Sequence, residues 1–434
     1  MKLSSIVKNK TVVNAGWLIG GKIVQMLISF FVGLFTARYL GPSNYGLIGY
    51  AGAYTAFFMC FCTLGINSVL VKEFVDNPGQ EGKIIGTSLG LRAISSFFSA
   101  IIIFIIVFII DAGEKETIAV VILSSAGLIF NIFDTFNYWF QSRLQSKVTA
   151  KATLLAYIVS AAYKVYLMIS GKSVVYFALT SCLDHFCLAV VLLIEYRKNH
   201  GGKLSFSIKY GKYILGKSCH FILPSLMVAI YGQTDKLMLK QMISQTEIGY
   251  YSTAVTICGM WCFVLSAIID SVYPSIMKAH KLDKKLFERR NRQLYAIVFY
   301  VSAFVSVVFT IFAKPIVYLL FGKAYLPAIN PLRIITWYTA FSYLGVARNA
   351  WIVCENKQRY LFPIYLSAAV SNVILNLLLI PRWGASGAAA ASLATQIITT
   401  MVTPFFIKPI RRNSILMLEA IALKGVFDNK SKHI

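Results

Sequence analysis

Three basic residues, Lys22, Arg92 and Lys164, lie inside stretches of sequence that are apolar enough to cross a lipid bilayer. A basic side chain at the centre of a spanning helix is unfavourable by about 2.5–3.5 kcal/mol even on lenient scales. Each residue therefore needs a water-filled cavity, a buried carboxylate such as Asp134 or Asp184, or a route to the membrane interface. For any single residue, the sequence leaves these alternatives open.

Other polar residues share a helix face with each of these cations, at steps of three or four residues. We expect the three faces to avoid lipid and to line one cavity through the cytoplasmic half of the membrane. Lysine and arginine together typically bind phosphate, so this cavity would attract a phosphate-bearing anion, and Arg348 from a later stretch would add a contact. The faces are Asn14, Leu18, Lys22, Gln25, Ser29, Gly33 and Thr36; Ser88, Arg92, Ser95 and Ser99; and Thr149, Thr153, Tyr157, Ser160 and Lys164.

Three aspartates within the apolar stretches are candidates to bind a coupling ion or to contact a sugar: Asp134, Asp184 and Asp235. Asp134 lies in "NIFDTFNYWFQ", whose aromatic rings suit either sugar stacking or a belt at the membrane interface. A lone intramembrane carboxylate such as Asp235 is typical of proton or sodium binding. Its place near the end of its stretch, beside Lys236, favours exposure at the interface instead.

The composition excludes a soluble globular protein. Of 434 residues, 57% are hydrophobic and only 14% are charged, with a mean hydropathy of +0.68, far from the globular average of about 25% charged residues. The net charge of +25 would suit nucleic acid, but in so apolar a chain it indicates basic cytoplasmic loops. The eight cysteines show no metal-ligand spacing, and we expect no metal and no cofactor.

Apolar windows of roughly 20 residues recur about twelve times, which predicts an all-α integral membrane protein. Most basic residues fall on one side of these spans, so both termini should be cytoplasmic. A long basic link at 195–217 predicts two six-helix lobes, residues 1–200 and 201–410, and a cytoplasmic amphipathic tail at 411–434. "KPIVYLLFGKAYLPA" at 314–328 is too short to span and predicts an interfacial or re-entrant segment. The spans are 12–37, 45–71, 84–110, 117–140, 148–170, 174–195, 213–236, 248–276, 293–313, 331–353, 360–381 and 385–407.

One nucleotide-binding pattern occurs, "GKYILGKS" at 211–218, which fits the phosphate loop of nucleotide hydrolases. No predicted strand precedes it, and the residues that follow enter an apolar span, so the context that the motif requires is missing. We therefore expect this chain to hydrolyse no ATP and not to act as an enzyme of this type.

Several stretches together resemble the O-antigen type of polysaccharide flippase, within the multidrug/oligosaccharidyl-lipid/polysaccharide exporter superfamily. They are "ARYLGPSNYGLIGYAGAY" at 37–54, "TDKLMLKQMISQTEIGYYSTA" at 234–254, "YPSIM" at 273–277, "LLFGKAY" at 319–325 and "NLLLIPRWGASGAAAASLATQ" at 376–396.

The resemblance implies an alternating-access flippase of the bacterial inner membrane. Its substrate would be an undecaprenyl-diphosphate-linked oligosaccharide, moved from the cytoplasmic to the periplasmic leaflet. On this interpretation Lys22, Arg92 and Lys164, with Arg348, hold the diphosphate. A polysaccharide polymerase and chain-length proteins would be partners, and nucleic acid would not.

Two other transport functions stay open. A multidrug antiporter of the related extrusion family would favour acidic cavity residues, for which Asp134 and Asp184 are candidates. A flippase for the peptidoglycan precursor would carry the same lipid diphosphate. A polymerase or ligase acting on that lipid would need a long periplasmic loop with catalytic groups, and no loop on that side is long enough.

Paired reporter fusions test the predicted topology. A reporter fused after Lys203 or after Lys284 should report the cytoplasm, and one fused after Gly113 should report the periplasm, because basic loops remain on the cytoplasmic side. A periplasmic signal after Lys203 would contradict the division into six spans and six.

Overall fold

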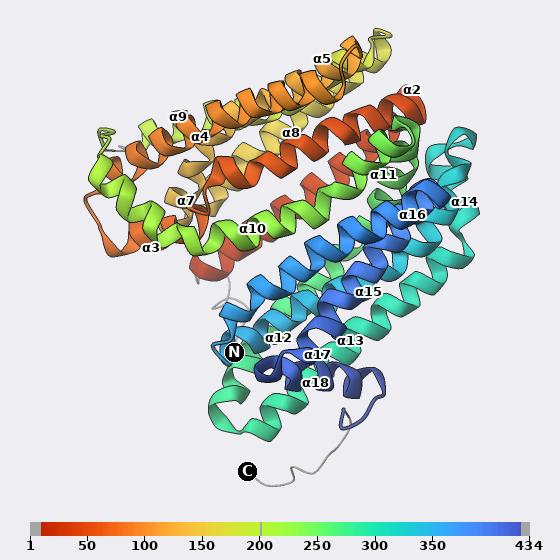
Figure 1. The fold of residues 1–434 in the computed structure, drawn as a ribbon. Coiled ribbons are helices and arrows are strands. Elements are labelled where there is room, and N and C mark those ends of the chain that lie inside the picture. Colours follow the sequence, from red (N-terminus) through yellow and green to blue (C-terminus); the bar gives the residue numbers. More distant parts are fainter. Residues whose placement is uncertain (1–9, 200–201, 427–434) are drawn as a thin grey trace. The chain divides into compact units, whose positions relative to one another are not determined.

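The computed structural model describes residues 10–199 and 202–426, and every element of regular structure within them is helical, which confirms the predicted all-α class (Figure 1). Helices suit these apolar runs because a helix satisfies its own backbone polar groups without water. The longer helices are α2 (Lys10–Thr63), α4 (Glu81–Ile110), α8 (Ser146–Ile169), α9 (Val174–Lys198), α10 (Ile208–Met242), α11 (Gln245–Gly259), α12 (Cys262–Leu282), α13 (Lys284–Ile311), α15 (Ile329–Cys354) and α16 (Leu361–Ile397). The shorter ones are α3 (Asn67–Asp76), α5 (Lys115–Ser125), α6 (Gly127–Phe130), α7 (Thr135–Ser142), α14 (Ala313–Phe321), α17 (Thr403–Phe406) and α18 (Arg411–Ile421). Turns of 3-10 helix lie at Asn131–Asp134, Lys323–Ala328, Gln358–Tyr360 and Lys408–Ile410, and a π-helical turn lies at Ile398–Val402.

Two of the longest helices are each broken once at a glycine. In α2 the break is at Gly41, with a φ of 70°, and Pro42 follows it. In α16 the break is at Gly384, with a φ of 52°. Glycine populates this left-handed region without the steric penalty that a Cβ atom brings. Glu247 of α11 accepts a hydrogen bond of 2.6 Å from the backbone N–H of Ala385, just after the second break.

Among the described residues, eight helices are long and apolar enough to cross a membrane, or nine if the bent pair within α10 counts as one span. Two of them, of 44 and 49 residues, contain the glycine breaks and far exceed the roughly 20 residues that one crossing needs. The chain is a multi-pass membrane protein. The twelve predicted spans are mainly helical, although some, such as 45–71 and 248–276, run across a break between two helices, and the count of twelve crossings stays a prediction.

The chain divides into two compact units, Met1–Ala229 and Ile230–Ile434. An aromatic cluster around Phe136, Trp139 and Phe140 forms a core in the first unit. Another cluster, which includes Tyr295 of α13 and Trp351 of α15, forms a core in the second. The boundary between the two units lies within α10 and not at residue 200. The first turns of α10 belong to the first unit because Ile214 packs into its core. The proposed lobes of six spans each stay a prediction.

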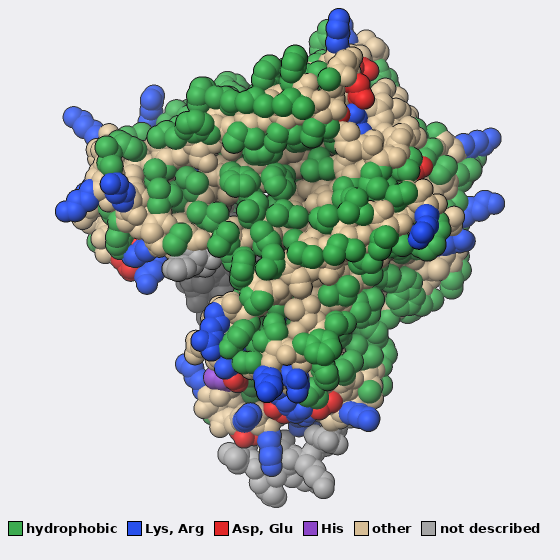
Figure 2. Space-filling model, viewed as in Figure 1, with side chains coloured by type: hydrophobic (Ala, Val, Ile, Leu, Met, Phe, Trp, Pro, Cys, Tyr) green, Lys and Arg blue, Asp and Glu red, His purple; other side chains and the backbone are tan. Residues whose placement is uncertain are grey.

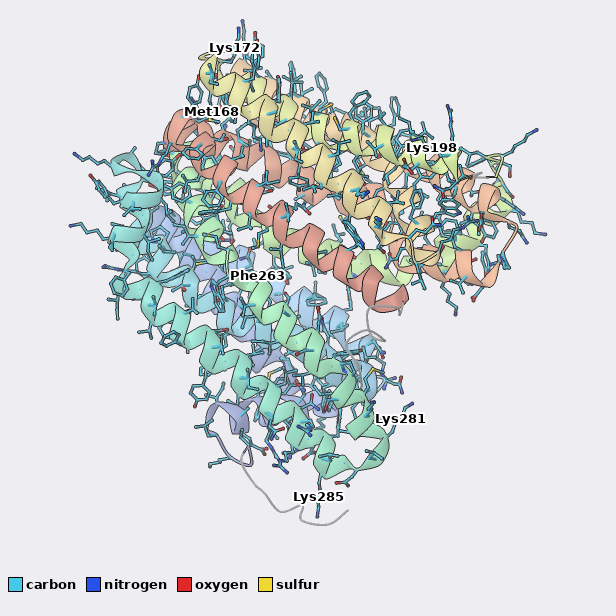
Figure 3. All side chains as sticks on the ribbon, turned by 180° about the vertical axis from the view of Figure 1, so that it is seen from behind. Met168, Lys172, Lys198, Phe263, Lys281 and Lys285 are labelled. Carbon is cyan, nitrogen blue, oxygen red and sulfur yellow. The ribbon has the colours of Figure 1, made fainter. Side chains whose placement is uncertain are left out.

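Apolar side chains cover the long sides of the helices, and basic side chains gather at the helix ends (Figure 2). On α4, for example, Phe97, Phe98, Phe108 and Ile109 are all strongly exposed, as expected of a surface that faces lipid. Lys172 and Lys198 mark the two ends of α9 (Figure 3). This distribution matches a helix that crosses a bilayer from one aqueous side to the other.

The final described helix is docked on its own unit and is not a free tail. Leu416 and Met417 of α18 are buried in the core of the second unit, and Arg412 pairs with Glu288 of α13 at 2.6 Å and with Glu419 at 2.9 Å. The predicted interfacial segment at 314–328 forms α14 and a 3-10 turn. Residues 427–434 of the predicted tail, and the side chains of Asn14, Leu18 and His220, lie outside the described part of the chain.

The segment with the nucleotide-binding pattern lies wholly within helix α10. Its backbone therefore forms helical hydrogen bonds and no phosphate-binding loop. Lys217 of this segment pairs at 2.8 Å with Glu73 of α3, a residue that is 1% exposed, and Tyr210 donates a hydrogen bond of 2.7 Å to the same carboxylate. The lysine of the pattern thus has a structural partner.

The ion pair between Lys217 and Glu73 should make stability depend on pH. Burial raises the pKa of Glu73, but hydrogen bonds from Lys217 and Tyr210 outweigh it and hold that pKa below its ordinary value. A carboxyl whose folded pKa is depressed contributes stability above its unfolded pKa, and this contribution is lost as the pH falls through the folded pKa.

We predict that Lys217→Met lowers the unfolding midpoint of the purified protein at pH 7 by on the order of 2–4 °C, and that the difference shrinks on acidification as Glu73 is protonated. Thermal unfolding in detergent across a pH series measures both effects. Lys198→Met is the matched control, because its partner Glu195 forms an exposed pair. Equal midpoints for wild type and Lys217→Met at pH 7 would show that the pair contributes nothing.

Candidate functional site

Arg92 of α4 is buried within the first unit, with 1% of its surface exposed. Its Nη2 atom donates a hydrogen bond to Oδ1 of Asn67 on α3, and its guanidinium lies 5.9 Å from the ring centroid of Tyr138 on α7. Its Nε and Nη1 atoms have no hydrogen-bond partner within residues 10–199 and 202–426. Asp134 attracts the charge. Arg92 therefore keeps a desolvated positive charge with unused donors.

Lys22 of α2 lines a cavity of ≈ 340 Å³, the Lys22 cavity, whose walls come from α2, α7 and α8. Asp134 and Asn137 line it too, and Asn137 donates a hydrogen bond to the Asp134 carboxylate. Tyr138 is part of the same wall and is also the ring that faces Arg92. The structure thus brings three of the predicted residues, Lys22, Arg92 and Asp134, to one region.

Lys164 of α8 lines a separate cavity of ≈ 600 Å³, the Lys164 cavity, together with Asp184 of α9. Ser160 donates a hydrogen bond to Asp184, and Asp184 attracts Lys164. Thr36 of α2 and Thr180 of α9 add hydroxyl groups to the wall. This cavity therefore combines one basic and one acidic group with several neutral hydroxyls.

From the sequence we expected the three cations to line one cavity. In the structure they do not. Lys22 and Lys164 line different cavities, and Arg92 contributes to neither wall. The reason is distance along the helix, because Lys164 lies roughly 20 Å further along α8 than Ala150 of the Lys22 cavity, at about 1.5 Å per residue. The predicted polar faces of α2 and α8 are shared between the two cavities, with Gln25 and Thr153 in one and Thr36 in the other.

Asp235 of α10 is buried in the second unit, with 2% of its surface exposed, so the predicted exposure at the membrane interface is wrong. The helix continues past Asp235 to Met242, which places this residue about two turns inside the helix end. Its carboxylate accepts hydrogen bonds from Asn372 at 2.9 Å, from Asn376 at 2.6 Å and from Tyr251 at 2.6 Å. Ser392 is a fourth donor.

We call these five residues, Asp235, Tyr251, Asn372, Asn376 and Ser392, the Asp235 network. Four of them, all except Asn376, line a cavity of ≈ 180 Å³ within the second unit. Four donors on one carboxylate stabilise its negative charge away from water. Among the described residues, no group of three or more His, Cys, Asp or Glu side chains is placed to hold a metal ion.

The sequence analysis missed the partners of Asp235. Asn372 and Asn376 are four residues apart on α16 and form one face of that helix, and such an asparagine pair inside the apolar run "SNVILNLLLI" is itself a signal of buried polar contacts. Ser392 carries no comparable signal, because the break at Gly384 separates it from the pair.

Arg348 of α15 is 2% exposed and lies within the second unit. Its Nη1 atom donates a hydrogen bond of 3.1 Å to the carbonyl oxygen of Thr399, inside the π-helical turn. Its Nε atom has no partner in the described part of the chain, and Tyr231, which lines the cavity beside Asp235, is one of the rings near its guanidinium. Arg348 and Asp235 therefore belong to neighbouring parts of one polar region.

The chain is similar in sequence to two bacterial proteins over most of its length. It is 23% identical to "Capsular polysaccharide biosynthesis protein CapF" of Staphylococcus aureus over 405 residues, which covers 92% of this chain and 99% of that protein. It is 21% identical over 397 residues to "Putative O-antigen transporter" of Escherichia coli (strain K12), covering 88% of this chain and 92% of that one.

The fold is shared with a solved membrane transporter. The structure titled "Lipid II flippase MurJ, inward closed conformation" matches with a TM-score of 0.68 at 15% sequence identity, over 92% of this chain and 91% of that one. The family model described as "Polysaccharide biosynthesis protein" matches residues 35–330, well over half of the sequence. The chain therefore belongs to the polysaccharide biosynthesis protein family and has the helical fold of a membrane transporter.

Proposed function

We propose that this protein is a flippase for an undecaprenyl-diphosphate-linked oligosaccharide, which it moves from the cytoplasmic to the periplasmic leaflet of a bacterial inner membrane. Membership of the polysaccharide biosynthesis protein family supports this proposal. A relative named for O-antigen transport and a structural neighbour titled as a lipid II flippase point the same way. The residues of the first unit supply the chemical argument.

The observation that carries the proposal is the state of Arg92. A buried charge with unsatisfied donors is strongly unfavourable, and nothing within the described residues offsets it at Nε and Nη1. A diphosphate presents several oxygen acceptors, and charge-assisted hydrogen bonds to arginine are among the strongest that side chains form. A diphosphate that reached Arg92 would satisfy these donors.

The neighbouring groups have distinct roles in this proposal. Lys22 provides an accessible second positive charge in its cavity, and Tyr138 and Asp134 offer a ring and an acceptor for sugar hydroxyls. Lys164 and Asp184 form a second polar station further along α8. Arg348 is the corresponding basic group of the second unit. A polysaccharide polymerase and chain-length proteins are the partners that this function would serve.

Deletion of the gene, complemented by variants, tests the proposal. Cells without the protein should accumulate a lipid-diphosphate-linked oligosaccharide on the cytoplasmic side of the membrane. Expression of the wild-type protein in these cells should remove the accumulated lipid. Lys22→Ala should reduce transport at least about tenfold, because a charge-assisted hydrogen bond is lost, while Lys22→Arg keeps part of the activity since it keeps the charge. Lys198→Ala is the matched control at an exposed helix end.

The abundance of each variant in the membrane must be measured alongside transport. Full activity of Lys22→Ala at normal abundance would remove Lys22 from the diphosphate site and leave Arg92 and Lys164. Accumulation of the peptidoglycan precursor, or increased sensitivity to cationic drugs with no accumulating lipid, would each favour the corresponding rival function. The carboxylates of Asp134 and Asp184 in the two cavities are what a cationic drug would require.

We also propose that Asp235 binds the coupling ion, a proton or a small cation. The carboxylate is oriented by four donors and lies beside a cavity. A change of charge at this point would alter hydrogen bonds to α11 and to both segments of α16 together. Such a shared hydrogen-bond network is a physical route from ion binding to helix movement.

We predict that Asp235→Asn abolishes the dependence of transport on an ion gradient, and that Asp270→Asn, an exposed aspartate on α12, leaves that dependence unchanged. Added Na⁺ should raise the unfolding midpoint of purified wild type but not of Asp235→Asn, because the charge that binds the ion is gone. A midpoint that rises equally in both proteins would exclude Asp235 as the ion site.

A further inference from the structure

A groove lies along the contact between α2 and α8, next to the Lys22 cavity. This α2–α8 groove has a volume of ≈ 490 Å³ and is bounded mainly by Gly16, Trp17, Gly20, Ala150, Lys151 and Leu154. A Cβ atom added at Gly16 or at Gly20 would meet nothing within 4 Å. The two glycines therefore leave the groove open along α2.

The groove continues into an exposed apolar face of α2. Val24, which also bounds it, is followed on the same face of α2 by Leu27 and Phe31, and all three are strongly exposed. The spacing of three and four residues places them on one side of the helix. A hydrocarbon chain that lies along this face can therefore reach the groove without crossing a polar surface.

One end of the groove is basic. Lys147 and Lys151 of α8 hold their ammonium groups 5.3 Å and 6.0 Å from the ring centroid of Trp17, which is 39% exposed. Within the described residues, neither lysine forms an ion pair with a carboxylate. Lys147 lies in the first turn of α8. A tryptophan with lysines near a helix end is typical of the depth at which lipid head groups lie.

The wall between the groove and the Lys22 cavity is thin. Gly21 and Ala150 bound both spaces, and a Cβ atom at Gly21 would lie 3.2 Å from that of Ala150. Only a hydrogen atom and a methyl group therefore separate the apolar groove from the cavity that holds Lys22. A lipid held at this contact would have its head group within reach of the polar side.

We propose that the α2–α8 groove is the docking site for the lipid end of the substrate. In this docked position, before the head group reaches Lys22 and Arg92, the phosphates of a polyprenyl diphosphate lie between Lys147 and Lys151, and the first isoprene units lie beside Gly16 and Gly20. This inference rests on the proposed flippase function and adds a lipid site that is distinct from the Lys22 cavity. Charge complementarity selects the occupant, since an apolar groove that ends at two unpaired lysines suits a lipid whose head is anionic.

Binding to the full-length protein in phosphatidylcholine nanodiscs tests this site, with undecaprenyl diphosphate and the uncharged undecaprenol as probes. Lys147→Gln combined with Lys151→Gln should raise the Kd for the diphosphate about tenfold or more, because two charge-assisted contacts are lost, and should leave undecaprenol binding unchanged. Gly20→Leu should weaken both probes by filling the groove. Gly216→Leu is the matched control, since a Cβ there also meets nothing within 4 Å.

The outcomes separate the site from the function. Wild-type affinity in both the lysine and the Gly20→Leu variants would overturn the groove as the lipid site and leave the flippase proposal standing. If wild type itself fails to bind the diphosphate, the flippase proposal fails with it. Equal competition by phosphatidylglycerol would show a general phospholipid site and would also overturn this inference. If Gly20→Leu lowers the unfolding midpoint, its weaker binding could reflect misfolding, and the double lysine variant then decides the test alone.

Discussion

A charge buried inside an apolar helical protein must be compensated by a partner, and much of this structure depends on that constraint. Buried carboxylates have their compensation within the structure, as Glu73 does with Lys217 and Asp235 with its four donors. Arg92 and Arg348 are different, because both are buried and pair with no carboxylate in the described residues, and Arg92 keeps two guanidinium nitrogens and Arg348 one without a partner there. In a medium of low dielectric this distinction separates charges that hold helices together from charges that are available to a ligand.

Much of this arrangement was predictable from the sequence because it follows from local periodicity. Apolar runs of the right length give the helices, and the serine steps around Arg92 correctly place that residue on the buried face of α4. The helix break at Gly41 falls between the first two predicted spans. Polar residues at these steps on α2 and α8 do face cavities, since Gln25 and Thr153 line the Lys22 cavity and Lys164 lines the other one.

The rest depended on contacts between distant segments, which periodicity does not encode. Asp235 looked like an interfacial residue because its local sequence gives no sign of the asparagines and the serine that meet it from α16. The division of one expected cavity into two follows from the distance along α8 between Lys164 and the wall of the Lys22 cavity. Gly21 and Ala150, where α2 and α8 touch, form the wall between the Lys22 cavity and the α2–α8 groove. A glycine and an alanine in a sequence do not reveal that they form a wall.

The Asp235 network depends on Gly384, a residue that has no side chain. A Cβ atom there would lie 2.4 Å from Oε2 of Glu247, the same oxygen that accepts the N–H of Ala385 and fixes the start of the second α16 segment. Ser392 lies about two turns along that segment. In a survey of natural or random variants, position 384 should therefore tolerate replacement as poorly as Asp235 itself. An intolerant position of this kind marks the scaffold of a site and not its chemistry.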